Sequence, residues 1–144
     1  MNTIIREANS DDFESIYSLI CDLEDQQMDK ESFKIIYSKN LGDPNIYYLV
    51  ADKSNSVVGF ISLHVQHILH HSKPTCELQE LTINSDLRGI GIGGLLMKEV
   101  EIIARKLNLE EIELTTKIHR ERAQEFYRNL GYIHTHNKFV KKLY

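Results

Sequence analysis

The segment DLRGIGIGGLL, from Asp86 to Leu96, places four glycines within six positions. Glycine loses more conformational freedom on folding than any other residue, so such a bare backbone indicates a need for close approach or unusual torsion angles. An apolar run with helical spacing follows at once, which puts the glycines at the beginning of a helix. Because backbone N–H groups at a helix N-terminus bind anions, the segment predicts a phosphate-binding turn.

Two common kinds of phosphate loop do not fit this turn. Gly89, Gly91 and Gly94 formally match the G-x-G-x-x-G pattern of dinucleotide-binding proteins. However, the polar segment NSDLR separates the glycines from the preceding strand pattern, and the next strand pattern, EIELTTK, has no final acidic residue to hold a ribose. A nucleoside triphosphate loop would require Gly-Lys-Ser/Thr after the glycines, and this is absent.

The spacing Arg88-x-x-Gly91-x-Gly93, between a strand pattern and a helix pattern, fits a third arrangement. In it the glycines turn backbone N–H groups toward a diphosphate, and the helix N-terminus adds partial positive charge. Arg88 adds further charge or braces the loop. Gly89 and Gly94 are expected to supply flexibility and close packing.

The remaining patterns predict a single mixed α/β domain over residues 1–144. Alternating and β-branched segments predict strands, the three central ones forming an antiparallel meander, and apolar stripes of helical spacing predict helices. Ser10 is expected to cap the first helix, with Asp11 and Asp12 in its first turn. The expected order is strand 2–8, helix from 10, helix 31–41, strands 46–52, 56–69 and 76–83, the helix after the glycines, strand 110–116, helix 123–130 and strand 132–143.

Composition and charge exclude several classes of function. The 17 basic and 21 acidic residues give a formal net charge of −4, which argues against nucleic acid as the main partner. No apolar stretch approaches the roughly 18 residues of a membrane helix, and the charged N-terminus lacks the apolar core of a signal peptide, so a cytoplasmic protein is expected. Cys21 and Cys76 show no metal or redox spacing and are expected to be reduced core thiols.

Two motifs together resemble one family of enzymes. The Arg88-x-x-Gly91-x-Gly93 turn is similar to motif A of the GNAT superfamily of acetyl-CoA-dependent N-acetyltransferases, and RAQEFYRNLGY, residues 122–132, is similar to the family segment A-x-x-F-Y-x-x-x-G-F/Y. The resemblance covers essentially the whole chain and implies the GNAT fold, a mixed α/β architecture with a central, mostly antiparallel sheet flanked by helices. It also implies acetyl-CoA as cosubstrate, bound by Leu81, Thr82, Ile83, Arg88, Gly89, Ile90, Gly91, Ile92, Gly93 and Gly94.

The segments ICDLEDQ, NLGDPN, SLHVQHILHH and LQEL narrow the resemblance to the aminoalkylphosphonate N-acetyltransferase branch. Its members acetylate the primary amine of small aminophosphonates. Arg120 stands where many superfamily members carry Asn, so what that Asn does for coenzyme A must be achieved differently. Other acceptors stay open, namely a polyamine, an aminoglycoside or a protein N-terminus, as does a non-catalytic acetyl-CoA-binding sensor. The resemblance also allows a homodimer.

Acetyl transfer to an amine requires a neutral amine and a proton for the departing thiolate. Tyr127 matches the general acid of the family, and a phenol with a pKa of about 10 is suited to protonating a thiolate. Glu77 matches the base, acting directly or through water, with Glu80 in reserve. Residues three apart on a strand point to opposite faces unless a bulge intervenes, so the choice between them stays open. Direct transfer is expected, because neither cysteine lies in a nucleophile motif.

An anionic phosphonate needs cationic or hydrogen-bond-donating side chains. The candidates, provided that their strands converge, are His64, His71, Arg120, His136 and Lys138. The spacing H-x-x-H-x-x-H-H is not a recognised metal signature, so no metal site is predicted, although a divalent ion bridging a phosphonate stays open.

Overall fold

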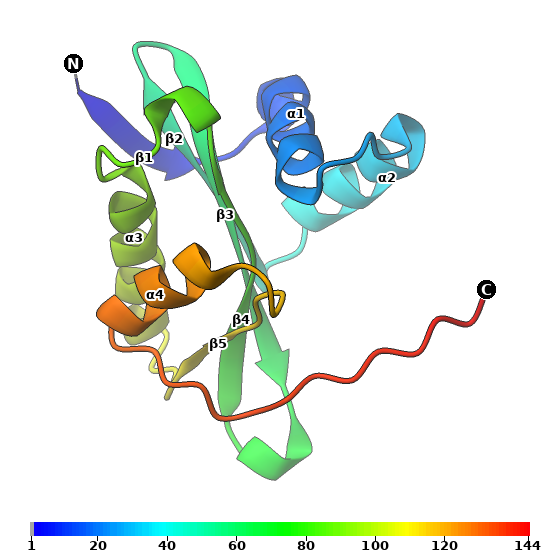
Figure 1. The fold of residues 1–144 in the computed structure, drawn as a ribbon, viewed down its shortest axis with the longest axis vertical. Coiled ribbons are helices and arrows are strands. Elements are labelled where there is room, and N and C mark those ends of the chain that lie inside the picture. The colour runs from blue at the N-terminus through cyan, green and yellow to red at the C-terminus, as the bar shows by residue number, and fades with distance from the viewer. Residues whose placement is uncertain (1) are drawn as a thin grey trace. The chain divides into compact units, whose positions relative to one another are not determined.

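A five-stranded sheet, in the order β1-β2-β3-β4-β5, forms the framework of the computed structural model, which describes residues 2–144 (Figure 1). The strands are β1 (Thr3–Glu7), β2 (Ile46–Lys53), β3 (Ser56–His67), β4 (Pro74–Ile83) and β5 (Ile112–Leu114). The helices are α1 (Phe13–Glu24), α2 (Lys30–Leu41), α3 (Ile92–Lys106) and α4 (Glu121–Asn129), and short 3-10 turns lie at Ser10–Asp12, Leu69–His71 and Ser85–Leu87. The chain divides into two compact units, one ending at Glu113 and one running from Leu114 to Tyr144.

Strands β1 to β4 of the first unit pair antiparallel with their sequence neighbours. The predicted central meander is therefore confirmed, as are the mixed α/β class and the order of elements as far as α4. Each strand is rich in β-branched or aromatic residues, which pack well on a pleated surface. The register between β3 and β4 shifts between Ser62 and Leu63, and the register between β2 and β3 shifts between Ala51 and Asp52.

Helices α1 and α2 cover one face of the sheet, and α3 covers the other (Figure 1). Phe60 of β3 faces α1 and packs in a buried cluster with Ile16 and Val50. The neighbouring Gly59 faces α3, because successive residues of a strand point to opposite faces. A Cβ at this glycine would lie 2.9 Å from Ile83 Cδ1 and 3.2 Å from Leu96 Cδ1, so its missing side chain lets α3 approach the sheet closely.

The start of α1 differs from the predicted Ser10 cap. Asn9 instead caps the 3-10 turn Ser10–Asp12 that leads into α1, and its side chain accepts a hydrogen bond from the Asp11 N–H at 2.9 Å; α1 itself begins after Asp12 without a side-chain cap. Asp12 completes the arrangement, since its carboxylate accepts the Asn9 N–H at 2.8 Å and two guanidinium N–H groups of Arg6 at 2.9 Å. The hydrogen-bonded Arg6 lowers the pKa of Asp12. The reciprocal pairing of Asn9 with Asp12 shifts the cap by one residue.

The strand expected over residues 132–143 does not form, and that prediction is wrong. These residues lie in the second unit and have no helical or strand conformation. Tyr132 is half-buried, but Ile133, Phe139 and Leu143 are 81%, 93% and 82% exposed. A β-rich composition favours a strand only where side chains can pack on a neighbouring strand, which explains the error.

Candidate active site

The chain turns sharply between the end of β4 and the start of α3. The Asn84 side chain accepts the N–H of Asp86 at 3.0 Å and begins the 3-10 turn at Ser85–Leu87. Gly89 and Gly91 then adopt left-handed torsion angles, with φ values of +84° and +94°. These values favour glycine over any residue that carries a Cβ, which explains two of the glycines directly.

The backbone of this glycine loop, Arg88 to Gly94, is open on its outer side. A Cβ at Gly89, Gly91 or Gly94 would meet nothing within 4 Å. Gly91 is the N-cap residue of the 15-residue helix α3, and no side chain caps this end. The first-turn N–H groups and the positive end of the helix dipole can therefore meet an anion. The close packing expected of Gly94 is not found; Gly59 has that role instead.

Residues Leu81, Thr82 and Ile83, predicted to bind the pantetheine arm, form the last part of β4. Thr82 is fixed on the α1 face, where its hydroxyl donates to the Leu19 carbonyl at 3.3 Å. Strand β5 has three residues against ten in β4, and the adjoining Glu111 carbonyl accepts the Cys76 thiol at 3.5 Å, near the other end of β4. β5 is thus too short to reach the backbone of the pantetheine segment.

A β-bulge places Glu77 and Glu80 on one face of the sheet. Glu80 lies opposite Ser62 and Glu77 lies opposite His64, while Gln79 has no partner in the register. Ser62 and His64 are two apart on β3 and so share a face, which is the face of α1 and α2. The unpaired Gln79 is thus the bulge that the sequence analysis allowed for, and it explains why two residues three positions apart share a face.

We call the five side chains gathered on this face the polar cluster: Tyr48, Ser62, His64, Glu77 and Glu80. The Ser62 hydroxyl donates to the Glu80 carboxylate and accepts the Glu80 N–H at 3.0 Å. Glu77 accepts from the Gln66 amide at 3.2 Å. The two carboxylates thus differ in their surroundings, since Glu80 is held by a fully buried hydroxyl and Glu77 by a half-buried amide.

Tyr48 borders the polar cluster from β2. Its ring centroid lies 6.5 Å from that of His64, and its hydroxyl accepts from the Asn40 amide at 2.6 Å. Burial raises the pKa of Tyr48, so its phenol stays protonated at neutral pH. The cluster therefore combines two acidic side chains with an imidazole, a serine hydroxyl and a phenol.

Tyr127 lies in helix α4 of the second unit, where its ring contacts Phe126 and Tyr132 at centroid distances of 5.3 and 5.8 Å. Burial raises the pKa of Tyr127 to about 12, although the positive charge of Arg120 opposes the rise. A phenol with this pKa is fully protonated at neutral pH and can serve as a proton donor.

Within the first unit, the two histidines predicted to bind the anion, His64 and His71, lie in different places. His64 belongs to the polar cluster, whereas His71 lies at the β3–β4 hairpin beside Glu111 and Glu113. His136 lies in the second unit, where its Nδ1 is 2.6 Å from the Thr135 hydroxyl. Arg120 and Lys138 also belong to the second unit. Glu111 and Glu113, which flank His71, were not among the site residues predicted from the sequence. The acidic residues of the segment EEIE, which lies shortly before a pair of threonines, could have drawn attention to them.

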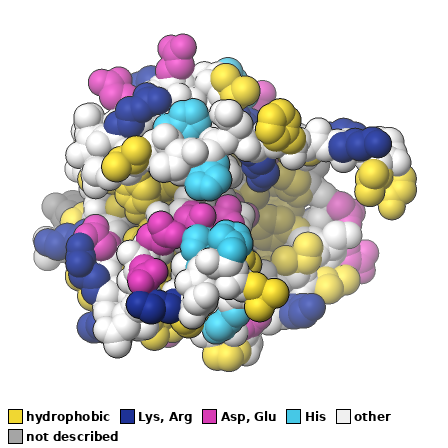
Figure 2. Space-filling model, turned by 90° about the horizontal axis from the view of Figure 1, so that it is seen from below, with side chains coloured by type: hydrophobic (Ala, Val, Ile, Leu, Met, Phe, Trp, Pro, Cys, Tyr) yellow, Lys and Arg dark blue, Asp and Glu magenta, His cyan; other side chains and the backbone are white. Residues whose placement is uncertain are grey.

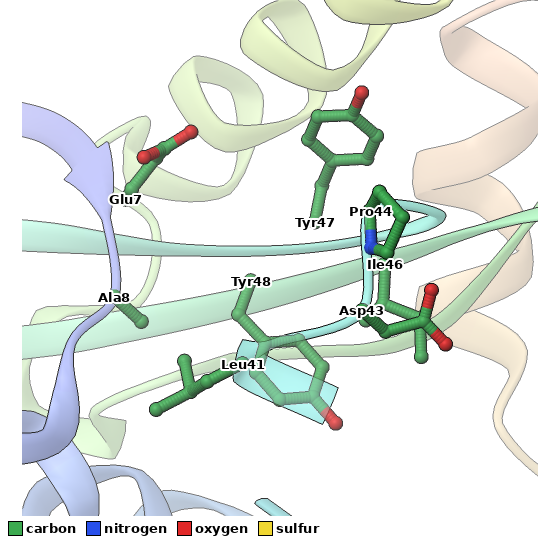
Figure 3. Close-up of a pocket in the computed structure, with 8 residues that line it drawn as sticks. All are labelled: Glu7, Ala8, Leu41, Asp43, Pro44, Ile46, Tyr47 and Tyr48. Carbon is green, nitrogen blue, oxygen red and sulfur yellow. The ribbon is translucent and has the colours of Figure 1, made fainter. Parts of the chain in front are cut away.

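A shallow pocket elsewhere in the first unit has a different character (Figure 3). Asp43 lines it, but its carboxylate caps the adjoining turn by accepting the Asn45 N–H at 2.8 Å. Of the polar cluster, only Tyr48 reaches it, and no residue of the glycine loop does. The pocket therefore shares only Tyr48 with the polar cluster; its lining is Glu7, Ala8, Leu41, Asp43, Pro44, Ile46, Tyr47 and Tyr48.

The chain belongs to the acetyltransferase (GNAT) family, whose model matches residues 3–132. It is 40% identical over 139 residues to the aminoalkylphosphonate N-acetyltransferase of Salmonella typhimurium, which covers 96% of this chain and 90% of that relative. The protein is accordingly an acetyl-CoA-dependent N-acetyltransferase. The predicted family, fold class, enzyme class and cosubstrate are thus confirmed.

Solved structures show the same fold at low sequence identity. A GNAT family acetyltransferase of Staphylococcus aureus superposes with a TM-score of 0.81 at 23% identity, covering 99% of this chain and all of that one. An aminoglycoside N-acetyltransferase in complex with CoA has a TM-score of 0.87 at 16% identity, covering 98% of this chain and 94% of that one. In residues 2–144, none of the helices combines the length and apolar character that crossing a membrane requires.

Proposed function

We propose that the acetyl acceptor is the primary amine of a small aminoalkylphosphonate. One observation carries this proposal: the 40% identity to an aminoalkylphosphonate N-acetyltransferase extends over 96% of the chain and therefore over the strands that hold the polar cluster. The solved aminoglycoside N-acetyltransferase matches this chain at 16% identity and supports only the fold.

The polar cluster offers complementary groups for such a molecule. Glu77 and His64 lie directly opposite each other on β4 and β3. Side chains at such positions are about 5 Å apart at Cβ, which suits an acceptor whose amine and anionic group are separated by one or two carbons. In this arrangement Glu77 accepts the amine and the imidazole of His64 donates to the phosphonate. His71 is left out of the acceptor site, because carboxylates flank it.

Glu77 is the proposed general base, acting directly or through a water molecule. Glu80 is assigned a positioning role, because it is already bound to Ser62 by both its carboxylate and its backbone N–H. The glycine loop with Arg88 binds the diphosphate of coenzyme A, and the backbone of Leu81 to Ile83 binds the pantetheine arm. Tyr127 is the proposed general acid.

The reaction is a direct transfer. The amine nitrogen attacks the thioester carbonyl, so a C–N bond forms and the C–S bond breaks. The base takes the proton lost by the amine, and the Tyr127 phenol protonates the departing thiolate. No acyl-enzyme is needed: burial raises the pKa of Cys76 to about 11, so its thiol is not a nucleophile at neutral pH.

The acceptor is tested by following free thiol in the presence of acetyl-CoA. Aminomethylphosphonate and aminoethylphosphonate should be acetylated with a kcat/KM at least about 100-fold above those of ethylamine, which lacks an anion, and β-alanine, which carries a carboxylate instead. A polyamine, an aminoglycoside and a peptide N-terminus complete the panel. If any of the other amines were acetylated in preference to the aminophosphonates, the proposed acceptor would be wrong, but the assignment to the acetyltransferase family would stand.

A further inference from the structure

A group of three ionisable side chains lies outside the polar cluster, at the β3–β4 hairpin. His71 ends the 3-10 turn Leu69–His71, and Glu111 and Glu113 come from β5 and the residue before it. His71 Nδ1 lies 3.5 Å from Glu111 Oε1, and His71 Nε2 lies 3.7 Å from Glu113 Oε2. All three residues belong to the first unit. On the face drawn in Figure 2, histidine side chains adjoin acidic ones.

These distances are longer than those of direct hydrogen bonds, which are about 2.7–3.2 Å. One ligand atom can be taken from each side chain so that all three lie within 4.8 Å of one another. Around a tetrahedral metal with bonds of about 2.1 Å, neighbouring ligand atoms lie about 3.4 Å apart. Small side-chain rotations would therefore bring the three atoms to metal-binding distances.

The charges also favour a cation. Glu111 and Glu113 alternate along the strand and so point to the same side, where their carboxylates repel each other. The nearby Lys73 does not neutralise the carboxylates of Glu111 and Glu113, since its ammonium pairs with Glu110 at 2.8 Å. The left-handed Ser72 and its N–H bond to the Leu69 carbonyl at 3.1 Å fix the turn that presents His71.

We propose that His71, Glu111 and Glu113 bind one divalent transition-metal ion, of which Zn²⁺ fits best, with water completing the coordination. One imidazole nitrogen and two carboxylate oxygens are ligands that Zn²⁺ commonly takes in proteins. The ion ties the β3–β4 hairpin to the short strand β5. This site is separate from the acceptor proposal, because neither Glu77 nor Glu80 takes part in it.

Titration of metal-stripped protein tests the site without reference to turnover. Co²⁺ should give a visible absorption spectrum that saturates at one ion per chain, and Zn²⁺ should abolish it by displacement. Isothermal titration with Zn²⁺ should give micromolar or tighter binding. H71A and the double variant E111Q/E113Q should each weaken it at least about 30-fold.

Two matched variants serve as controls. H70A removes the adjacent imidazole, whose ring centroid lies 4.4 Å from that of His71, and E110Q removes the neighbouring carboxylate. Both should bind Zn²⁺ as the wild type does, and Zn²⁺ should raise the Tm of both but not of H71A or E111Q/E113Q. Thermal unfolding in chelator shows that each variant folds. Absent binding by the wild type, or equal losses in H70A and H71A, would overturn the site.

Discussion

In the glycine loop the groups proposed to bind coenzyme A belong to the backbone, whereas in the polar cluster the groups proposed to bind the acceptor belong to side chains. The loop presents N–H groups at the start of α3 through two glycines with positive φ. The cluster depends on which side chains a bulged strand brings to one face. A backbone site suits a cosubstrate shared by a whole family, and a side-chain site suits an acceptor that differs between members. Substitutions in the cluster and at Tyr127 should therefore reduce turnover, and those in the loop should weaken acetyl-CoA binding.

The largest effect is expected at Tyr127. Y127F removes the only proton that this residue can donate, so kcat should fall by about 10²–10⁴-fold while the Kd for coenzyme A stays unchanged. Y132F, which alters the adjacent phenol, should retain near wild-type turnover. Stopped assays of free thiol and calorimetric titration with coenzyme A measure the two quantities. An unaltered kcat in Y127F would show that a group other than Tyr127 protonates the departing thiolate.

The next largest effects should distinguish the two glutamates of the polar cluster, because their substitution should reduce activity to different extents. E77Q should lower kcat/KM for the amine by about 10²-fold at neutral pH, because the base is lost. The deficit should shrink as pH rises, since more of the free amine is then already neutral. E80Q keeps a partner for Ser62 and should show a smaller loss without that pH dependence. A larger, pH-dependent loss in E80Q would exchange the two roles.

The loop should respond in binding and stability, with a smaller effect. Alanine at Gly91, where φ is +94°, should cost about 1–2 kcal/mol of folding free energy. Alanine at Gly94 meets open space within α3 and should leave stability equal or slightly higher. Both should raise the KM for acetyl-CoA, by about tenfold for G91A. Thermal unfolding without ligand compares the pair, and equal Tm losses would contradict the assigned backbone geometry.

The smallest effect is expected from removing the cysteines. C21A and C76A should each keep turnover within about twofold, because direct transfer needs no thiol in either region. Mass spectrometry after mixing with acetyl-CoA should find no acetylated protein. A trapped acetyl group that disappears in C76A would show that the buried thiol takes part despite a pKa of about 11.

The conformation of the glycine loop, the proposed coenzyme A site, was predictable from the sequence because its signal is local. The positive φ angles at positions 89 and 91 favour glycine, so the loop can be recognised from glycines at a fixed spacing. The motif could therefore be placed before α3 without knowledge of the fold. The meander and the main helices were predictable for the same reason, since hydrophobic periodicity reflects local burial.

The arrangement of the polar cluster, the proposed acceptor site, was less predictable from the sequence, because it depends on pairing between strands. Whether Glu77 and Glu80 share a face is decided by the unpaired Gln79, and no local pattern marks this residue as a bulge. The group of His71 with Glu111 and Glu113 joins segments far apart in the chain. Residues 132–143 illustrate the opposite case. Their local pattern predicts a strand, but in the structure they do not pair as one.

Gly59 links the packing of the sheet to the loop proposed to bind coenzyme A. Helix α3 carries the glycine loop at its N-terminus and rests on the sheet where Gly59 leaves room for Leu96. A methyl group at that point would first meet the ends of the Ile83 and Leu96 side chains, which would have to shift for the helix to keep its place on the sheet. A buried strand position far from the glycines in sequence thus belongs to the foundation of the proposed coenzyme A site, and a search limited to ligand contacts would overlook it.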